Sequence, residues 1–207
     1  MEIAIIGTGN MARAIGTRAL DAGHDVTFHG TTRDKAQQLA GELSGSAKAA
    51  AIGDPLEGDL VVLALWYPVT REVAERYGDA LDGKVVVDIS NPVNTETFVR
   101  IVPDAGSGAE EVAAAAPGAR VVKAFNTTFA GTVTAGEVSG QPLDVLIASD
   151  DDEAKQTVAG LAEDGGLRAI DVGPLERARE LEAAGYLHMV VQDGLGTGYG
   201  SALKIVS

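Results

Sequence analysis

Short apolar runs alternate with amphipathic segments along most of the chain. The run at residues 3–6 is apolar at every position, which is typical of a parallel strand covered on both faces. Further runs of this kind recur, separated by segments in which apolar residues return every three or four positions. Strands are predicted at residues 3–6, 25–29, 47–50, 60–65, 84–89, 120–124, 143–148 and 167–172.

The segments between these strands carry helix signals. Thr31 or Thr32 is a suitable N-cap for the second helix, and Ser107 with Glu110 resembles a capping box. Residues 95–106 show no clear period and are expected to form a surface excursion. Helices are predicted at residues 10–22, 33–43, 68–78, 107 onward, 151–162 and 175–192.

This alternation predicts an α/β fold with a Rossmann-type, doubly wound parallel sheet. The length of 207 residues suits one large domain, or a main domain with a small annex. We expect residues 1–140 to form the main domain, and residues 141–207 to form a small C-terminal α/β part that completes the sheet.

A glycine turn joins the first predicted strand to the first helix. Residues 7–12 read Gly-Thr-Gly-Asn-Met-Ala, which is the G-x-G-x-x-A pattern of dinucleotide-binding units. Gly7 permits the tight turn, Gly9 lets the backbone approach a pyrophosphate, and Ala12 lets the helix pack closely on the strand. The N–H groups of the first helical turn then face the pyrophosphate. The alternative is a glycine turn in an α/β protein that binds no nucleotide.

The end of the second strand selects between the two nicotinamide coenzymes. NAD-binding units usually carry an Asp or Glu here for the ribose 2′-hydroxyl, and this chain has none at the strand end. Instead, Thr31, Thr32, Arg33 and Lys35 follow within a few positions. Hydroxyl and cationic groups suit a dianionic 2′-phosphate, which favours NADP(H) over NAD(H). The alternative is an ordinary N-cap followed by a solvated helix face.

Later strand ends carry further candidates. The only Trp of the chain, Trp66, is expected either to stack on a ring in the crevice or to pack in the core with Tyr67. Lys123 is expected either to neutralise a cofactor charge or to pair with Asp88. The amides of Asn91 and Asn126 could bond a carboxamide or a ring carbonyl. No acid–base dyad is evident among these residues.

Two histidines and a glycine-rich tail have open roles. His29 is expected to pack or to contact the ribose, and His188 to pack or to face a second ring. Four glycines lie within residues 194–200, so this segment either approaches a flat ring closely or forms a flexible turn.

Composition excludes several function classes. The formal charge of −14 opposes general nucleic-acid binding, and the absence of cysteine removes disulfides and thiolate chemistry. No metal site is expected, because nothing sets ligand spacing among the three histidines. No apolar stretch reaches membrane-spanning length, and no secretion signal precedes the first strand, so a cytoplasmic protein is expected.

Four motifs, taken in order, resemble one family. They are residues 5–11 (Ile-Ile-Gly-Thr-Gly-Asn-Met), 30–33 (Gly-Thr-Thr-Arg), 121–127 (Val-Val-Lys-Ala-Phe-Asn-Thr) and 171–179 (Asp-Val-Gly-Pro-Leu-Glu-Arg-Ala-Arg). Over nearly its whole length the chain resembles the F420-dependent NADP oxidoreductases, the NADPH:coenzyme F420 reductases. It is also similar to the reductase domain of membrane metalloreductases.

The resemblance implies hydride transfer between NADP(H) and coenzyme F420, an 8-hydroxy-5-deazaflavin, in a homodimer with small-molecule partners only. It implies a nicotinamide in the crevice beyond the strand ends. Residues 1–140 would then be the NADP-binding Rossmann domain, and residues 141–207 would cover the acceptor site, where the deazaflavin lies. The acceptor is expected at Asn126, Thr128 and Gly196. The expected nucleotide-binding residues are Gly7, Thr8, Gly9, Asn10, Met11, Thr31, Thr32, Arg33, Lys35, Leu65, Trp66, Tyr67, Asn91, Pro92, Ala124 and Asn126.

The chain departs from the family pattern at two places. Thr-Thr-Arg stands where F420-reducing members commonly have Ser-Arg, and Asn126 stands where they have a His. Two further hypotheses therefore stay open. One is an NADPH-dependent reductase of another acceptor, such as a flavin, a ferric chelate or an imine. The other is a non-catalytic NADP(H)-binding protein.

Overall fold

The computed structural model describes residues 1–43 and 47–206. Its strands are β1 (Glu2–Ile6), β2 (Asp25–Gly30), β3 (Lys48–Ala51), β4 (Leu60–Leu63), β5 (Val85–Asp88), β6 (Arg120–Lys123), β7 (Glu137–Val138), β8 (Gln141–Pro142), β9 (Asp144–Ala148) and β10 (Arg168–Gly173). Its α-helices are α1 (Asn10–Asp21), α2 (Arg33–Glu42), α3 (Tyr67–Tyr77), α4 (Gly108–Ala115), α5 (Ala130–Ala135), α6 (Asp152–Asp164), α7 (Ala178–Val190) and α8 (Gln192–Leu195). Short 3₁₀ turns lie at Gly78–Leu81 and Leu175–Arg177.

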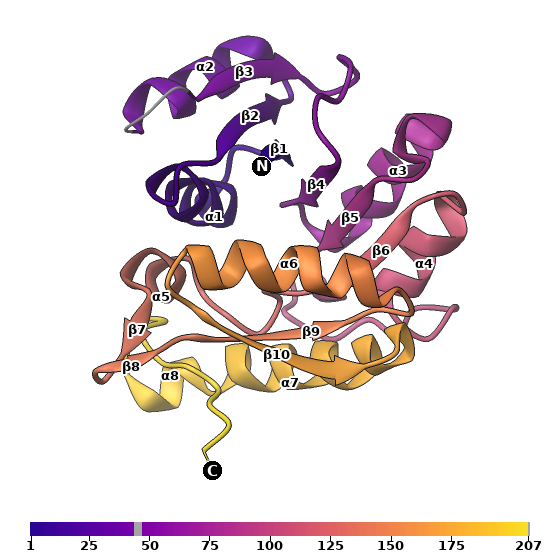
Figure 1. The fold of residues 1–207 in the computed structure, drawn as a ribbon. Helices are drawn as coiled ribbons and strands as arrows, with labels where there is room; N and C mark the ends of the chain where they lie inside the picture. Colours follow the sequence, from indigo (N-terminus) through magenta and orange to yellow (C-terminus); the bar gives the residue numbers. More distant parts are fainter. Residues whose placement is uncertain (44–46, 207) are drawn as a thin grey trace.

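Eight strands form one sheet in the order β10-β9-β6-β5-β4-β1-β2-β3, with helices on both faces (Figure 1). Strands β1 to β6 run parallel, and the order reverses at β1. The predicted Rossmann-type α/β fold is therefore confirmed. The predicted strands are present, and so are the predicted helices other than the one over 175–192, with bounds that differ from the prediction by at most three residues.

The last two strands differ from the prediction of a wholly parallel sheet. β9 pairs antiparallel with β6 through Lys123 and Ala148, and β10 runs parallel to β9. Because Ala148 ends β9, the earlier residues of that strand extend beyond the end of β6. The reversal follows the connection through α5 and the β7–β8 hairpin, neither of which was predicted. A six-residue helix and two-residue strands are too short to show a period.

The alternation of side chains along β1 divides the core into two layers. Ile3 and Ile5 face a layer that includes buried residues of α1, α2, α5 and α6. Ala4 and Ile6 face the other side, where buried residues of α3 and α4 cover the sheet. Both faces are covered, which explains why the run is apolar throughout.

Local chemistry fixes the helix ends. Thr32 caps α2 by accepting the Lys35 N–H, as expected, and Ser107 caps α4 by accepting the Glu110 N–H. Ser107 Oγ also donates to the Glu110 carboxylate at 2.7 Å, so the reciprocal contact differs from a strict capping box. The predicted helix over 175–192 is divided into a 3₁₀ turn, α7 and the start of α8.

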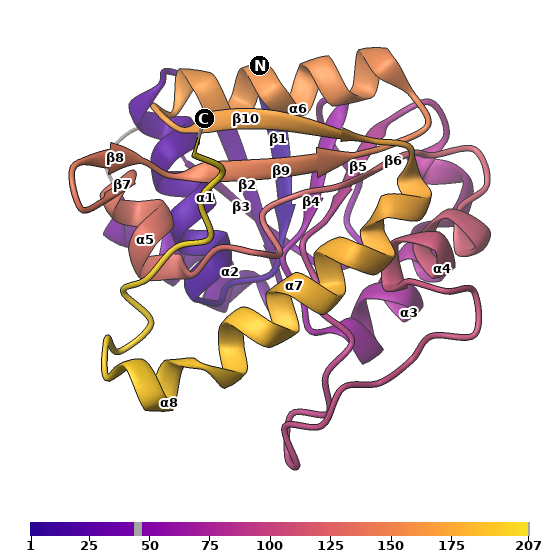
Figure 2. The same ribbon diagram turned by 90° about the horizontal axis from the view of Figure 1, so that it is seen from below.

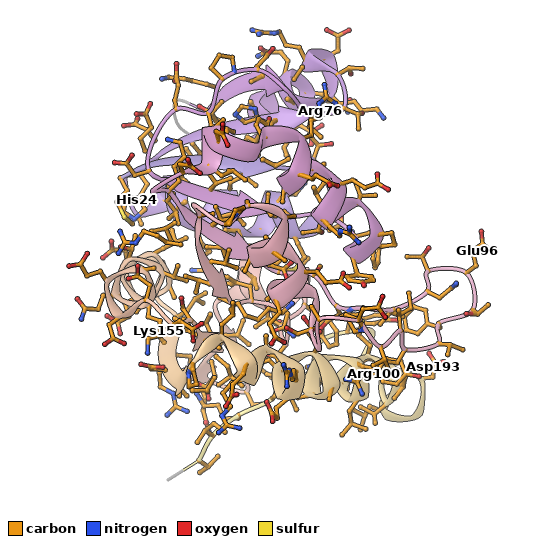
Figure 3. All side chains as sticks on the ribbon, turned by 90° about the vertical axis from the view of Figure 1, so that its right-hand side faces the viewer. His24, Arg76, Glu96, Arg100, Lys155 and Asp193 are labelled. Atoms are coloured by element: carbon orange, nitrogen blue, oxygen red, sulfur yellow. The ribbon has the colours of Figure 1, made fainter. Side chains whose placement is uncertain are left out.

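The segment 95–106 lies outside helices and strands, as predicted, and projects from the body of the molecule (Figure 2). Glu96 lies far out on this projection, and Arg100 and Asp193 lie toward the same side (Figure 3). No helix among the described residues is long and apolar enough to span a membrane.

Candidate functional site

The carboxyl ends of the parallel strands carry the predicted site. The loops after β1, β2, β4, β5 and β6 all leave the sheet at this edge, where α/β proteins bind their ligands. Helix α7 crosses in front of the sheet (Figure 2). Its inward side is buried and includes Glu182, Gly185 and His188. The strand ends and α7 therefore form the framework of the site.

The glycine turn has the geometry that a pyrophosphate requires. Gly7 has φ +126°, and a Cβ there would lie 2.3 Å from the carbonyl oxygen of Ala64. At Gly9, φ is −83° and no described atom lies within 4 Å of the position a Cβ would take. No side chain in the described part caps α1. The first-turn N–H groups, including those of Asn10 and Met11, are thus available to an anion.

The residues predicted to bind the 2′-phosphate lie beside this turn. The Cγ2 atom of Thr8 would lie 3.2 Å from a Cβ at Gly30, so the loops after β1 and β2 are adjacent. Thr31, Arg33 and Lys35 are all exposed. Arg33 Nη2 donates to Asp54 Oδ2 at 2.7 Å, a contact that the sequence did not suggest.

His29 closes the inner side of the same region. It is buried, and its Nδ1 lies 3.4 Å from the carbonyl oxygen of Ala51. Its Nε2 has no hydrogen-bond partner among the described residues. Burial lowers the pKa of His29, so the ring is neutral at pH 7. The packing role predicted for His29 is therefore present, and a ribose contact stays a prediction.

The two predicted amides meet at the ends of β5 and β6. Asn91 Nδ2 donates to the Asn126 carbonyl oxygen at 2.7 Å, and Asn126 Nδ2 donates to Asn91 Oδ1 at 2.8 Å. Asn126 also donates to the Leu181 carbonyl oxygen at 2.9 Å, which ties the pair to α7. A Cβ at Gly185 would lie 2.7 Å from Asn91 Oδ1, so only glycine permits this approach. We call Asn91 and Asn126 the amide pair.

Two polar atoms at this point have no partner in the described part of the chain. They are Asn126 Oδ1 and Ser90 Oγ, and both residues are buried. Buried polar atoms are nearly always hydrogen-bonded, so their presence at the strand ends fits a ligand that supplies donors and acceptors. An amide such as the nicotinamide carboxamide has both.

The residues after β4 have separate environments. Trp66 is 63% exposed, so the prediction that it packs in the core is wrong. It is the N-cap residue of α3, and Pro68 follows in the first turn of that helix. Leu65 and Tyr67 are half-buried, and Tyr67 donates to Glu111 Oε2 at 2.8 Å. Burial, aided by Glu111, raises the pKa of Tyr67 far above its usual value, so it stays protonated. A stacking role for Trp66 remains a prediction.

Lys123 lies in a buried charge cluster rather than in the crevice. Its Nζ donates to Asp88 Oδ2 and Glu182 Oε1, each at 2.7 Å, and to the Ser90 carbonyl oxygen at 2.6 Å. The predicted pairing with Asp88 is present, and the contact with Glu182 was missed. Glu182 also accepts the Gly108 N–H at the start of α4. This cluster joins α4 and α7 to the ends of β5 and β6.

The charges in this cluster depend on one another. Burial opposes the charge on Lys123, but Asp88 and Glu182 together outweigh it and raise the pKa of Lys123. Burial also raises the pKa of Glu182, with Lys123 opposing. In the described part of the chain, the hydrogen bonds to Glu182 come from backbone N–H groups and from the Lys123 ammonium, an arrangement that favours the ionised carboxylate.

Removing the cation should therefore destabilise the protein strongly. Lys123→Met leaves two buried carboxylates without their counter-charge, and we expect the free energy of unfolding to fall by about 3–5 kcal/mol. Urea denaturation would measure it. Lys48→Met is the matched control, because Lys48 contacts Glu57 at the surface and should leave stability near that of the unchanged protein. Equal losses in both variants would contradict this account.

The predicted acceptor residues do not form one group. Asn126 and Thr128 are buried, as is Ala124 of the predicted nucleotide site, and Thr128 Oγ1 donates to the Phe125 carbonyl oxygen at 2.7 Å within its own turn. Gly196 lies elsewhere, where it ends α8 with φ +63° in an exposed position. Pro92 is buried beside the amide pair. The Gly196 N–H donates to the Gln192 carbonyl oxygen of α8 at 3.0 Å.

The tail is instead tied to α7 through His188. The Nε2 atom of His188 lies 2.8 Å from Ser201 Oγ, and Nδ1 lies 3.0 Å from the Thr127 carbonyl oxygen. The Phe129 ring stacks on His188 with centroids 4.3 Å apart, and Tyr199 meets Phe129 edge-on. Burial lowers the pKa of His188. Its packing role is thus present, and the tail is held rather than loose at Ser201.

No group of three or more His, Asp or Glu side chains in residues 1–43 and 47–206 is arranged to hold a metal ion. The contacts described above instead place an open anion site, exposed cations and an amide pair along one edge of the sheet. This arrangement suits a dinucleotide lying across that edge.

Comparison with known proteins gives the family. Residues 2–92 match the family model described as NADP oxidoreductase, coenzyme F420-dependent. The F420-dependent NADP reductase of Methanocaldococcus jannaschii is 32% identical over 202 residues, which cover 88% of each chain. The chain belongs to the F420-dependent NADP reductase family. The match with this relative thus covers most of both chains.

Two other proteins show how far the likeness extends. A crystal structure from Arthrobacter sp. FB24, described as a candidate F420-dependent NADP-reductase, has a TM-score of 0.88 at 29% identity and covers 99% of both chains. The rat metalloreductase STEAP3 is 32% identical over 182 residues, and the match spans 36% of that protein. The F420-dependent NADP reductase fold thus accounts for this whole chain, whereas the metalloreductase continues well beyond the matched part.

Proposed function

We propose that this protein transfers a hydride between NADP(H) and the deazaflavin coenzyme F420. The observation that carries the proposal is the open, uncapped start of α1 at Gly9, on the same sheet edge as the amide pair. The family relation supplies the identity of both coenzymes. No acid–base dyad is needed, because the coenzymes carry the redox chemistry.

The chain's own residues would hold the nucleotide from one end to the other. The N–H groups of residues 8–11 would bind the pyrophosphate, and Thr31, Arg33 and Lys35 would bind the 2′-phosphate. Asn126 Oδ1 and Ser90 Oγ, which lack partners in the described part of the chain, would bind the carboxamide. These contacts orient the reacting ring, and orientation is the main requirement for transfer between two coenzymes.

The acceptor would lie on the side of the crevice bounded by α7. F420 would supply the ring that accepts the hydride, and one proton would be taken up overall for each hydride transferred from NADPH. Helix α7 would exclude water from that side, because Gly185 lets it approach the amide pair closely. Asn126, Thr128 and Gly196 remain our candidates for acceptor contacts. The division into residues 1–140 and 141–207 is proposed on the same basis, since β9 and β10 complete the sheet.

A homodimer in the cytoplasm is also proposed. The apolar side chains of Leu187, Val190, Val191 and Leu195 are 60%, 41%, 38% and 55% exposed. Their spacing puts them along one side of α7 and α8, where a second copy could cover them. Sedimentation as a monomer of 21.2 kDa would contradict the dimer. Cell fractionation that recovers the protein outside the cytoplasm would contradict the location.

An acceptor comparison tests the proposal. Purified protein would be mixed with NADPH and, in separate reactions, with F420, FMN, a ferric chelate and a cyclic imine. We expect F420 to be reduced much faster than the other acceptors, seen as loss of its visible absorbance. Faster reduction of any other acceptor would replace F420 in the proposal. Nucleotide binding without turnover of any of them would make the protein a non-catalytic binder.

A further inference from the structure

The loop between β3 and β4 places a fixed carboxylate beside the candidate 2′-phosphate site. Asp54 Oδ2 accepts hydrogen bonds from Arg33 Nη2 at 2.7 Å and from the Ala51 backbone N–H at 2.9 Å. The Arg33 side chain is 65% exposed, whereas that of Asp54 is 35% exposed. The carboxylate is thus positioned by the backbone, and the arginine reaches to it from the start of α2.

Further contacts hold this loop against the end of β2. The Ile52 N–H donates to the Gly30 carbonyl oxygen at 2.8 Å, and the Asp54 N–H donates to the Ala51 carbonyl oxygen at 3.0 Å. The Gly53 N–H donates to the Tyr77 hydroxyl oxygen at 2.9 Å. The first of these bonds joins the loop to the end of β2, the second lies within the loop, and the third joins it to α3, so the backbone on both sides of Asp54 is fixed.

This position changes what the site recognises. A carboxylate near the adenosine ribose favours a 2′-hydroxyl, which can donate to it, and disfavours a 2′-phosphate, which carries about −1.5 to −2 charge at neutral pH. Arg33 has the opposite preference. The sequence places no carboxylate at the end of β2, but the fold supplies one from the loop after β3.

Asp54 therefore opposes the 2′-phosphate in two ways. It occupies one terminal nitrogen of Arg33, a donor that would otherwise serve the phosphate. It also adds a negative charge at short range, which repels the dianion. Arg33 must leave or share this contact when NADP binds, whereas NAD binding leaves the ion pair intact.

We propose that Asp54 is a specificity-determining residue that limits the preference of this protein for NADP over NAD. The inference rests on the proposed function, because it takes Arg33 as the ligand of the 2′-phosphate. The preference for NADP over NAD then depends on the balance between attraction of the 2′-phosphate by Arg33 and its repulsion by Asp54. The chain then retains measurable affinity for NAD.

The test measures dissociation constants for NADP⁺ and NAD⁺ by titration calorimetry. In Asp54→Asn, we expect the ratio Kd(NAD⁺)/Kd(NADP⁺) to rise about tenfold, mainly through tighter NADP⁺ binding. Glu57→Gln is the matched control. Glu57 lies in the same loop and pairs with Lys48 instead of Arg33, so its ratio should stay within about twofold of the unchanged protein. Equal melting temperatures would show that both variants are folded.

An unchanged or lower ratio in Asp54→Asn would overturn the inference. A lower ratio would mean that Asp54 orients Arg33 for the phosphate. A third variant, Arg33→Ala, distinguishes failure of the role proposed for Asp54 from failure of the proposed 2′-phosphate site. If Arg33→Ala lowers the ratio and Asp54→Asn does not raise it, the inference fails and the proposed NADP site stands. If Arg33→Ala leaves the ratio unchanged, the 2′-phosphate site is wrong, and the inference fails with it.

Discussion

Gly9→Val should abolish nucleotide binding while the protein stays folded. The backbone at Gly9 has φ −83°, which any residue adopts, and no described atom lies within 4 Å of the new Cβ. The added methyl groups would instead project into the space at the uncapped start of α1, where the pyrophosphate is proposed to lie. We expect NADP⁺ affinity to fall at least about 100-fold, measured by calorimetry, with an unchanged melting temperature.

Two other glycines are the controls for this result. Gly41→Val changes a glycine of α2 that also has no described atom within 4 Å, and it should bind NADP⁺ normally. Gly7→Ala should lose stability as well as binding, because φ is +126° and the Cβ would lie 2.3 Å from the Ala64 carbonyl oxygen. Normal NADP⁺ binding by Gly9→Val would show that the nucleotide lies elsewhere.

Arg33→Ala should weaken binding of NADPH far more than binding of NADH. Only NADPH carries the 2′-phosphate, and charged hydrogen bonds to arginine are strong, so we expect about a 10- to 100-fold loss for NADPH. The loss for NADH should be small. Fluorescence titration with either reduced coenzyme would measure both constants. Equal losses would mean that Arg33 acts on a part shared by the two coenzymes.

Arg13→Ala is a suitable control for this comparison. Arg13 also forms a surface ion pair, with Glu42, and it lies in α1 two residues beyond Met11, outside the proposed pyrophosphate contacts. Arg13→Ala should leave the ratio of the dissociation constants, Kd(NADH)/Kd(NADPH), unchanged. If the ratio Kd(NADH)/Kd(NADPH) fell equally in Arg33→Ala and Arg13→Ala, the cause would be a general effect of surface charge.

Most of the fold could be predicted because the signals for strands, turns and helix caps lie within short stretches of the sequence. The apolar run of β1, the glycine turn after it and the Thr32 cap of α2 each depend on residues within a few positions. The direction of β9 was not predictable in this way. An apolar run indicates a buried strand, but it has the same composition whether the strand runs parallel or antiparallel to its neighbour.

The site was predicted in part for the same reason. Its glycines, cations and amides were found at strand ends, and the amide pair does meet in the structure. The carboxylates that pair with the predicted cations lie far from them in the sequence. Asp54 lies 21 residues from Arg33, and Glu182 lies 59 residues from Lys123. Single acidic residues in an acidic chain give no signal of such contacts, and only the fold brings them together.

Isotope transfer tests the central claim most directly. NADPH deuterated at the reactive face of C4 would be mixed with F420 and the protein in ordinary water, and the reduced F420 would be analysed by mass spectrometry. The account predicts that one deuterium moves from the nicotinamide to the deazaflavin ring. Reduced F420 without deuterium, from NADPH labelled on either face in turn, would contradict direct hydride transfer between the two coenzymes.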